Sequence, residues 1–442
     1  MNSLDLSVLV LAKREAANLR ELLPAVHRVL EHGIPRYEIL VVVERGDAET
    51  EAVARTCGAT VVVQQESGYG SAFREGFRRA AGRYVVALDA DLSHDPDLIL
   101  HLWAARGNAG LVIASRYVPG GHATMPVSRK VLSRLLNAVV RRGLSLNVRD
   151  VSSGFRLYRR EAVRPDALRA RHFDVLEEAL IDILADGWEI SEIPFHYRPR
   201  RHGQSTVRLL AFGFSFVRSF PRMWRLRNSA FSADYDERAF NSVIPLQRYW
   251  QRTRHKLIGA FVDPRTRILD LGCGSSRIIL GLSDAVALDI QLKKLRRIRG
   301  RHRRVVQGTI TSLPFGDRTF ETVICSQVIE HVPRELVSFA EMNRVLRLGG
   351  MLVIGTPDYG TVTWPLLEWA YGLVHPDGYV HEHINHYTAE TLSRELTDNG
   401  FRIVAHAYVG GGELIYKAEK VREAGAVANE PAGRPAVVGT TM

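Results

Sequence analysis

The sequence predicts an α/β protein made of two consecutive domains, each built around a mainly parallel β-sheet. Residues 4–195 alternate apolar, strand-like runs with amphipathic helical stretches, and this alternation restarts near residue 267. Such alternation is typical of parallel sheets covered by helices. The length of 442 residues also exceeds what a single hydrophobic core usually supports. Each series opens on a strand and loop of nucleotide-binding type, so we expect two Rossmann-like domains in succession.

The expected strands set the extent of these two domains. In the first series they are the apolar runs 4–12, 37–43, 59–63, 83–89 and 110–116. In the second series they are the segments RILDLG, AVALD, RVVQG, FETVICS and GGMLVIGTP, which follow one another from residue 267 onward.

The segments outside these strands give the domain boundaries. The first domain is expected over 1–227 and ends in a basic amphipathic segment, and the second domain is expected over 263–420. Between them, 228–262 is interpreted as a linker followed by a helix. The last residues, 421–442, are rich in Ala, Gly, Pro and Val, so we expect a disordered tail there.

Cysteine content and charge restrict the classes of protein that fit. The three cysteines, Cys57, Cys273 and Cys325, lie far apart and lack metal-like spacing, which argues against a disulfide-stapled secreted protein. No uncharged run approaches the ~20 apolar residues needed to span a bilayer. We therefore expect a cytoplasmic protein that at most lies on the inner face of a membrane. The net charge of +11 calls for an anionic partner or surface.

The first candidate site lies at the end of a buried strand, within VVALDADLSHDP (85–96). Asp89 and Asp91 emerge at the carboxyl end of this strand, where open α/β sheets bind ligands. A hard divalent cation that carries a diphosphate would satisfy two carboxylates one residue apart. A solvated acidic turn explains the pattern equally well when the pattern stands alone.

The neighbouring segments favour the cation site. Upstream, ESGYGSAFREGFRRAAG (66–82) forms a Gly-rich turn into a helix; downstream, ASRYVPGG (114–121) and VRDVSSGFRLYRRE (148–161) offer arginines. Taken together, these segments resemble the family-2 glycosyltransferases, specifically polyprenyl-phosphate sugar synthases such as dolichol-phosphate mannosyltransferase. The resemblance covers roughly 4–225 and implies a nucleotide-diphospho-sugar transferase fold.

The resemblance implies roles for individual residues. Asp89 and Asp91 match the motif that holds Mg²⁺ or Mn²⁺ and the sugar diphosphate. Arg116 matches the arginine of the family's SRY segment, and Arg200 with Ser205 matches the arginine and serine after the last strand. Catalysis would rest on positioning and on neutralising the departing nucleoside diphosphate, with inversion at the sugar carbon. The implied partners are a GDP- or UDP-sugar donor and a polyprenyl phosphate or glycan acceptor.

Three further positions match the family less closely. Glu177, in FDVLEEAL, is a candidate for the acceptor-side carboxylate. The family's first-strand YNE is KRE here, so only Glu15 remains, and its second-strand Asp-Asp is replaced by Val43-Glu44. The choice between GDP and UDP sugars therefore stays open.

The segment 208–227 bears on the acceptor. On a helical wheel, most of its apolar side chains share one side and its arginines the other. The apolar set is Leu209, Phe212, Phe216, Val217, Phe220, Met223 and Trp224, and the basic set is Arg208, Arg218, Arg222 and Arg225. Periodicity alone allows a helix on an anionic membrane surface or one docked on its own protein. The lipid-phosphate acceptor implied by the family favours the membrane.

The second candidate site lies in RILDLGCGSSRIIL (267–280) and in the strand that follows it. Asp270, Gly272 and Gly274 fall at a strand-to-helix turn, where glycines let the backbone pass close to a ligand. Asp289 ends the next strand about 20 residues later, the usual distance for an acid that binds ribose hydroxyls. A dinucleotide oxidoreductase could show the same pattern.

Two later segments decide between these classes. With SLPFGDRTFETVICSQVIEHVP (312–333) and RVLRLGGMLVIGTP (344–357), residues 245–420 resemble class I methyltransferases of the small-molecule and lipid type. The resemblance implies S-adenosylmethionine as cofactor, with the ribose on Asp289 and the donor methyl group near Gln327. The positions expected to form the cofactor site are Asp270, Gly272, Gly274, Asp289, Thr309, Ile310 and Gln327. Thr309-Ile310 stands where the family usually has Asp-Ala beside the adenine.

Histidines mark the acceptor side of this second site. Glu330-His331 matches the family's EH, and His331 is a candidate base for deprotonating a hydroxyl, although a structural histidine has equal weight. Downstream, HPDGYVHEHINHYT contains His381, His383 and His386, whose spacing could suit a metal. The preferred interpretation is a lid that packs near the acceptor, as related methyltransferases carry a similar stretch.

The sequence thus predicts a bifunctional enzyme. It would transfer a sugar to a polyprenyl phosphate or glycan, and a methyl group from S-adenosylmethionine to a sugar- or lipid-type small molecule. Two alternatives stay open: one domain is a degenerate binding module, as KRE and Val43 suggest, or the methyltransferase acts on nucleic acid, as the basic run 293–304 suggests. We expect no nucleic-acid partner, because we find no base-stacking or groove-reading motif.

Overall fold

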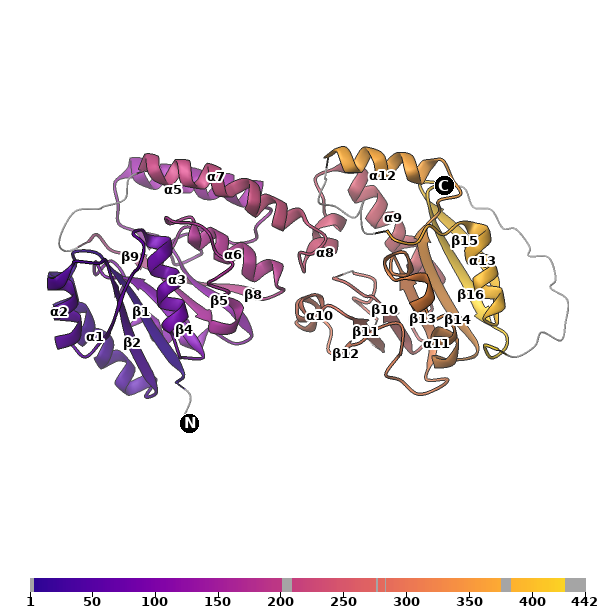
Figure 1. The fold of residues 1–442 in the computed structure, drawn as a ribbon, viewed down its shortest axis with the longest axis horizontal. Coiled ribbons are helices and arrows are strands. Elements are labelled where there is room, and N and C mark those ends of the chain that lie inside the picture. Colours follow the sequence, from indigo (N-terminus) through magenta and orange to yellow (C-terminus); the bar gives the residue numbers. More distant parts are fainter. Residues whose placement is uncertain (1–3, 201–208, 276, 283, 375–382, 426–442) are drawn as a thin grey trace. The chain divides into compact units, whose positions relative to one another are not determined.

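The chain divides into two compact units, Met1–Arg227 and Asn228–Met442, and each contains one large β-sheet (Figure 1). The computed structural model describes residues 4–200, 209–275, 277–282, 284–374 and 383–425. Ser205, His381 and most of the predicted tail, 421–442, lie outside the described residues.

The sheet of the first unit has the strand order β3-β2-β1-β4-β7-β5-β8. Strands β3, β2, β1 and β4 run parallel, and β7 is antiparallel to both β4 and β5. The strands are β1 (Leu6–Ala12), β2 (Tyr37–Val43), β3 (Thr60–Val63), β4 (Tyr84–Asp89), β5 (Ala109–Ser115), β7 (Arg156–Arg159) and β8 (Glu189–Pro194). A separate pair joins β6 (His122–Ala123) to β9 (His196–Tyr197). The mainly parallel sheet expected here is confirmed.

Helices cover both faces of this sheet, because neighbouring residues of each strand point to opposite faces. Val8 and Val10 of β1 face a core formed with α1 (Ala16–Gly33), α2 (Ala48–Thr56) and α4 (Leu98–Ala104). Leu9 faces the opposite core, to which the other helices contribute. These are α3 (Tyr69–Arg79), α5 (Val127–Gly143), α6 (Val175–Ala185) and α7 (Leu209–Asn228).

The aromatic side of α7 packs in part against its own unit, which is the docked arrangement that periodicity alone also allows. Phe216, Phe220 and Trp224 contact the core that also contains α3, α5 and α6. Contact with this core removes part of their apolar surface from water within the chain, and the helical wheel could not show which surface this would be. Phe214 and Val217 of the same helix remain exposed.

The sheet of the second unit has the strand order β12-β11-β10-β13-β14-β16-β15. Its first five strands in this order run parallel, and β16 is antiparallel to both β14 and β15. The strands are β10 (Ile268–Leu271), β11 (Ala285–Asp289), β12 (Val305–Gln307), β13 (Phe320–Ser326), β14 (Leu346–Pro357), β15 (Phe401–Val409) and β16 (Glu413–Lys420). Strands β10 to β14 are the five that the sequence predicts for this half.

Helices also cover both faces of the second sheet. Ile258 of α9 (Pro245–Phe261) and Leu295 of α10 (Leu292–Arg299) belong to the core on one face. The core on the other face includes α11 (Phe339–Val345) and α13 (Ala389–Asp398). The unit also contains α8 (Tyr235–Phe240) and α12 (Thr363–Val374). The segment 228–262, interpreted as a linker and a helix, therefore holds two helices of the second unit.

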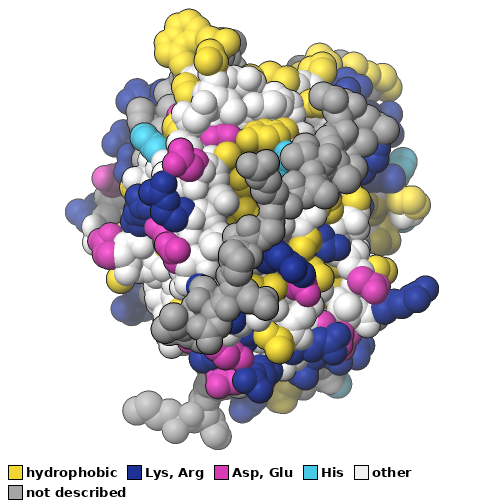
Figure 2. All heavy atoms as spheres, turned by 90° about the vertical axis from the view of Figure 1, so that its right-hand side faces the viewer, with side chains coloured by type: hydrophobic (Ala, Val, Ile, Leu, Met, Phe, Trp, Pro, Cys, Tyr) yellow, Lys and Arg dark blue, Asp and Glu magenta, His cyan; other side chains and the backbone are white. Residues whose placement is uncertain are grey.

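Basic and acidic side chains are interspersed on the face of the molecule that Figure 2 shows. Ion pairs of the second unit include those between Arg402 and Glu419 and between Arg318 and Glu423. Such pairing balances positive charge locally. Among the described residues, no helix has the length and apolar character needed to cross a membrane.

Candidate functional site

The residues predicted for the donor site of the first unit follow the carboxyl ends of neighbouring strands. Glu15 follows β1, Glu44 follows β2, Asp89 ends β4 and Arg116 follows β5. Because β1, β2 and β4 run parallel, their carboxyl ends meet at one edge of the sheet. This edge is where doubly wound α/β folds bind their ligands.

A charged network joins Glu15, Asp91 and Arg200 across this edge. Arg200 Nη1 donates to Glu15 Oε1 at 3.1 Å, and Arg200 Nε donates to Asp91 Oδ2 at 3.2 Å. Burial raises the pKa of Glu15. Burial opposes ionisation of Asp91 as well, but hydrogen bonds from Ser93 and nearby positive charge leave its pKa below the usual value. Arg200 thus supplies the cation that balances two carboxylates distant from it in sequence.

Asp89 lies beside this network and has partners of its own. Burial and the neighbouring charge of Asp91 raise the pKa of Asp89 to about 7. The Asp89 N–H donates to His94 Nδ1 at 3.0 Å, and burial lowers the pKa of His94 to about 4, so this imidazole is neutral. The Tyr69 hydroxyl is hydrogen-bonded to the Asp89 carboxyl, and its ring stacks on Phe173 with centroids 4.1 Å apart. Sequence reasoning missed Tyr69 and His94.

The two remaining residues at this edge are held by ion pairs. Arg116 Nε and Nη2 donate to Asp150 at 2.8 and 2.7 Å, and Nη2 also reaches Ser152 Oγ at 2.8 Å. Burial opposes the charge of Arg116, but its hydrogen bonds to Asp150 leave its pKa raised. Glu44 pairs with Lys13 at 2.8 Å. Arg116 is therefore oriented by a buried carboxylate, while Glu44 sits in a more exposed pair.

Glu177 lies inside the unit on α6 and is 2% exposed. Burial raises its pKa to about 8, although the nearby charge of Arg156 opposes this rise. Arg156 is fully buried and donates to the backbone carbonyls of Ser153, Leu176 and Val151. The structure therefore places Glu177 in a buried cluster beside Arg156.

The second unit contains a cavity of about 1040 Å³. The predicted residues in its wall are Gly272, Gly274, Asp289, Thr309, Ile310, Gln327 and His331. Asp270 is not among the lining residues; it is 2% exposed. Burial and then the charge of Asp289 raise the pKa of Asp270 to about 8. The structure thus brings all but one of the predicted residues of this half to one cavity.

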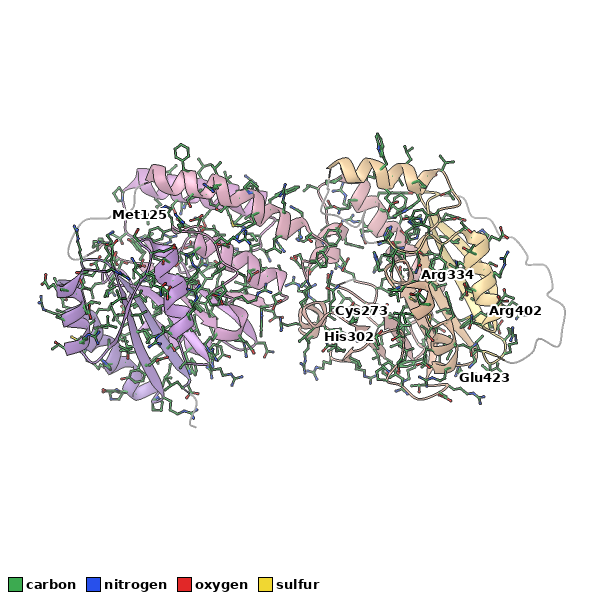
Figure 3. The ribbon with its side chains drawn as sticks, viewed as in Figure 1. Met125, Cys273, His302, Arg334, Arg402 and Glu423 are labelled. Carbon is green, nitrogen blue, oxygen red and sulfur yellow. The ribbon has the colours of Figure 1, made fainter. Side chains whose placement is uncertain are left out.

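The glycine-rich loop after β10 is held close to its neighbours. Gly272 has φ +64°, and a Cβ atom there would lie 2.4 Å from Val328 Cγ2. The Gly274 N–H donates to Asp289 Oδ2 at 2.8 Å, and the other carboxylate oxygen of Asp289 accepts the Gln291 N–H at 2.7 Å. Cys273, labelled in Figure 3, lies between these two glycines. Glycine is therefore required at 272 by both conformation and space.

Helices α8 and α9 form a part of the cavity wall that sequence reasoning missed. Tyr235, Phe240 and Trp250 line the cavity from these helices. Asp236 accepts hydrogen bonds from the Ser275 N–H at 2.9 Å and from Lys294 at 3.2 Å, so α8 is tied to the glycine-rich loop. The amphipathic pattern of 245–261 was the only signal of this wall in the sequence.

The predicted histidines that the structure describes, His331, His383 and His386, lie in two environments. His331 ends the 3-10 turn Ile329–His331, which follows β13, and its ring lies 5.0 Å from that of His383. Both rings line the cavity. His386 is exposed and stacks on Tyr359 with ring centroids 4.0 Å apart.

These two sites define a chain that joins a sugar-transferase type of α/β domain to a methyltransferase type. The Glycosyl transferase family 2 profile matches residues 7–165, and a Methyltransferase domain profile matches residues 269–354. The chain belongs to glycosyltransferase family 2 through its first half and carries a methyltransferase domain in its second half.

The chain is similar in sequence to two mannosyltransferases, and one solved methyltransferase structure resembles its second half. The chain is 32% identical to an undecaprenyl-phosphate mannosyltransferase of Micrococcus luteus, over 42% of this chain and 82% of that protein. It is 31% identical to a dolichol-phosphate mannosyltransferase of Pyrococcus furiosus, over 50% of this chain but less than two thirds (64%) of that protein. A solved SAM-dependent methyltransferase of Thermotoga maritima, a possible histamine N-methyltransferase, is 18% identical, with a TM-score of 0.36, over 42% of this chain and 93% of that chain.

Proposed function

We propose that the first unit transfers a sugar, with inversion, from a nucleotide-sugar donor to a polyprenyl phosphate. The observation that carries this proposal is the group formed by Glu15, Asp89, Asp91 and Arg200 at the carboxyl edge of the sheet. The relatives from Micrococcus luteus and Pyrococcus furiosus, which are mannosyltransferases of undecaprenyl and dolichol phosphate, support mannose as the sugar and a polyprenyl phosphate as the acceptor.

A divalent cation, Mg²⁺ or Mn²⁺, fits the carboxylates of Asp89 and Asp91. The two groups are close enough that the charge of Asp91 raises the pKa of Asp89, and a cation between them would remove this repulsion. Oxygen ligands of this kind suit hard divalent ions. When bound, the ion would neutralise the diphosphate that leaves with the nucleoside.

Two arginines complete the proposed donor and acceptor site. Arg200 lies within hydrogen-bond distance of Asp91, so its guanidinium is placed to contact a diphosphate held there. Arg116 is oriented by Asp150 and is the candidate to hold a phosphate of the acceptor. A phosphate acceptor is already anionic, so this reaction needs no strong general base. Glu177 would stabilise the buried cluster around Arg156 and would not contact the substrate.

The acceptor would reach this unit from an anionic membrane surface. Helices α5 and α7 lie side by side (Figure 1), with Phe220 next to Gly143. Both helices expose apolar side chains, namely Val127, Val131, Leu135 and Val139 on α5 and Phe214 and Val217 on α7. Phe214 and Val217 also line a cavity of about 950 Å³ together with Arg169, Arg171, Arg218 and Arg222. Apolar side chains beside arginines suit the interface of anionic lipids.

For the second unit we propose methyl transfer from S-adenosylmethionine to a sugar- or lipid-type small molecule. The cavity of about 1040 Å³ lies at the upper end of the ~300–1,000 Å³ range typical of ligand pockets, as expected for a site that takes a cofactor and an acceptor. Gly272 and Asp289 both line this cavity, and Asp289 would bind the ribose hydroxyls. Thr309 and Ile310 would flank the adenine.

The acceptor would occupy the part of the cavity near Gln327 and His331. Gln327 Nε2 is buried and has no hydrogen-bond partner among the described residues, so it can donate to a bound ligand. Tyr235, Phe240 and Trp250 supply aromatic faces to the same cavity, which suit sugar rings and prenyl chains. His331 and His383 would surround the nucleophilic oxygen of the acceptor.

Two assays on the purified full chain test this proposal. The first measures transfer of radiolabelled mannose from GDP-mannose, and of glucose from UDP-glucose, to undecaprenyl phosphate in the presence of Mg²⁺ or Mn²⁺. The second measures calorimetric binding of S-adenosylhomocysteine. Sugar transfer with cofactor binding supports two working sites. Absence of sugar transfer would make the first unit a degenerate binding module, and absence of S-adenosylhomocysteine binding would contradict the methyl transfer proposed for the second unit.

A further inference from the structure

Three side chains with metal-ligand chemistry cluster at the wall of the cavity in the second unit, where His331 and His383 line the cavity and Glu330 is buried behind it. Glu330 and His331 come from the 3-10 turn after β13, and His383 comes from the segment before α13. One ligand atom from each of the three lies within 4.8 Å of the others. Metal-bound nitrogen and oxygen atoms lie ~2.0–2.2 Å from the ion, so only a modest approach would complete a site.

One carboxylate oxygen of Glu330 is buried without a hydrogen-bond partner among the described residues. Its side chain is fully buried, and Oε2 accepts a hydrogen bond from Thr356 Oγ1 at 3.2 Å. Oε1 is also buried and has no hydrogen-bond partner among the described residues. Burying a carboxylate oxygen without a partner is unfavourable. A cation held by this oxygen would remove that penalty.

His383 is oriented as a metal-bound imidazole usually is. Its Nδ1 lies 3.0 Å from Glu368 Oε1 and 2.9 Å from the Tyr359 hydroxyl. Metal-ligating histidines commonly donate their second ring N–H to a carboxylate, which fixes the tautomer and the ring orientation. The hydrogen bond from Nδ1 to Glu368 leaves Nε2 available as a ligand.

The surroundings of the cluster favour a catalytic rather than a closed site. His331, His383 and Glu368 all line the cavity that also contains Gln327 and the glycine-rich loop. Three protein ligands leave at least one coordination position open, as in catalytic zinc sites. Two imidazoles with one carboxylate suit Zn²⁺, Mn²⁺ or Fe²⁺ better than Mg²⁺ or Ca²⁺, which prefer oxygen ligands.

We propose that Glu330, His331 and His383 hold a divalent transition-metal ion whose open position faces the cavity and takes the acceptor's hydroxyl. The metal site stands on the geometry of the cluster; its role toward the hydroxyl rests on the proposed methyl transfer. The ion would lower the pKa of the bound hydroxyl, and the proton would pass to water. The oxygen–methyl bond then forms as the methyl–sulfur bond breaks, and the electron pair stays on sulfur as S-adenosylhomocysteine. His331 would serve as a ligand and not as the proton acceptor.

The test is calorimetric titration of the full chain with Zn²⁺ and with Mn²⁺. It is done in a background that carries Asp89→Asn and Asp91→Asn, because these carboxylates form the other candidate cation site. We expect one ion per chain. His383→Ala should weaken binding by more than about 100-fold, and Glu368→Gln by about 10- to 100-fold. His386→Ala is the matched control, since this exposed ring stacks on Tyr359 outside the cluster, and it should bind as the background does.

Circular dichroism melting and S-adenosylhomocysteine binding are measured on every variant. Binding of no ion, or binding that survives His383→Ala in a folded protein, overturns the proposal. Equal losses in His383→Ala and His386→Ala overturn it as well. A chain that binds the metal but not S-adenosylhomocysteine retains the metal site and refutes the proposed methyl transfer, so the two ideas fail separately.

Discussion

In each unit the candidate site lies at the carboxyl edge of the sheet, but the two sites differ in what they offer a ligand. The first site is made of charges, with Arg200 between Glu15 and Asp91 and with Arg116 on Asp150. The second is an open cavity of about 1040 Å³, and its wall includes the glycine-rich loop after β10. A diphosphate and its cation are recognised by charge, whereas a cofactor with an adenine and an amino-acid part is recognised largely by shape.

The two sites share one device, which is a left-handed residue just after a parallel strand. Leu92 has φ +62° shortly after β4, and Gln327 has φ +60° directly after β13. Residues other than glycine adopt this conformation at an energetic cost, and such residues concentrate at functional sites. The turn in each case re-aims the chain at the carboxyl edge of the sheet, next to Asp91 in one unit and His331 in the other.

We expect the largest effect from removing one carboxylate of the first unit, which should leave the second unit unaffected. Asp91→Asn should lower sugar transfer by at least about 100-fold, because it removes a carboxylate that would hold the cation. Binding of S-adenosylhomocysteine, measured by calorimetry, should not change. Asp97→Asn is the control, since this exposed acidic residue lies a few positions further along the same loop. If Asp91→Asn lowers sugar transfer and S-adenosylhomocysteine binding equally, the two sites are not independent.

The reciprocal change tests recognition by space in the second unit. Gly272→Ala should weaken S-adenosylhomocysteine binding at least about tenfold, because the new methyl group would lie 2.4 Å from Val328 and φ is +64°. Sugar transfer should stay at the wild-type rate. The same substitution at Gly259, where a Cβ would meet nothing within 4 Å, serves as the control. An unchanged affinity in Gly272→Ala would exclude this loop as the cofactor site.

A pH series compares one buried carboxyl group from each unit. The folded-state pKa is raised to about 8 for Glu177 and for Asp270, from ordinary values of 4.5 and 3.8. The folded state therefore binds more protons than the unfolded chain in this range, and stability falls as pH rises through it. In Glu177→Gln and in Asp270→Asn, the free energy of unfolding should fall with pH by up to about 1 kcal/mol less per pH unit than in the wild type. Each variant should raise the melting temperature more at pH 8 than at pH 5; a gain independent of pH would contradict the account.

The smallest effect concerns the membrane surface proposed for the first unit. Val131→Ser combined with Leu135→Ser should lower co-sedimentation with anionic vesicles several-fold, because each side chain would lose part of the ~1.5–3 kcal/mol of its burial. Val362→Ser, at an exposed valine of the second unit, should bind vesicles as the wild type does. Serine at Phe216, Phe220 and Trp224 should lower the melting temperature instead, since these rings pack on the core. Wild-type protein that never co-sediments would exclude this surface.

Much of the fold and of both strand-end motifs could be predicted from the sequence. The strands were visible as apolar runs, and Asp89, Asp91 and the glycine-rich loop were visible because their residues are neighbours in the chain. The pairing of Arg200 with Glu15 was not predictable, because it joins residues 185 positions apart. Tyr69 on Asp89 and Glu368 on His383 escaped for the same reason.

The packing partners of α7 and of the helices in 228–262 were hidden for another physical reason. An amphipathic pattern shows that a helix buries one side, but it does not say what covers that side. The rings of α7 are covered by its own unit, and α8 and α9 close the wall of the cavity in the second unit. The cluster of Glu330, His331 and His383 was hidden because it joins the turn after β13 to a segment much further along the chain.

Hydrogen–deuterium exchange of the full chain tests the claim of two separate sites most directly. The chain is measured alone, with GDP or UDP plus Mn²⁺, and with S-adenosylhomocysteine. We expect the nucleotide to protect the loops after β1 and β4, including Glu15 and Asp91. S-adenosylhomocysteine should protect the loop after β10 and the end of β11. Protection of the same segments by both ligands, or of neither strand-end loop by its own ligand, would contradict the account.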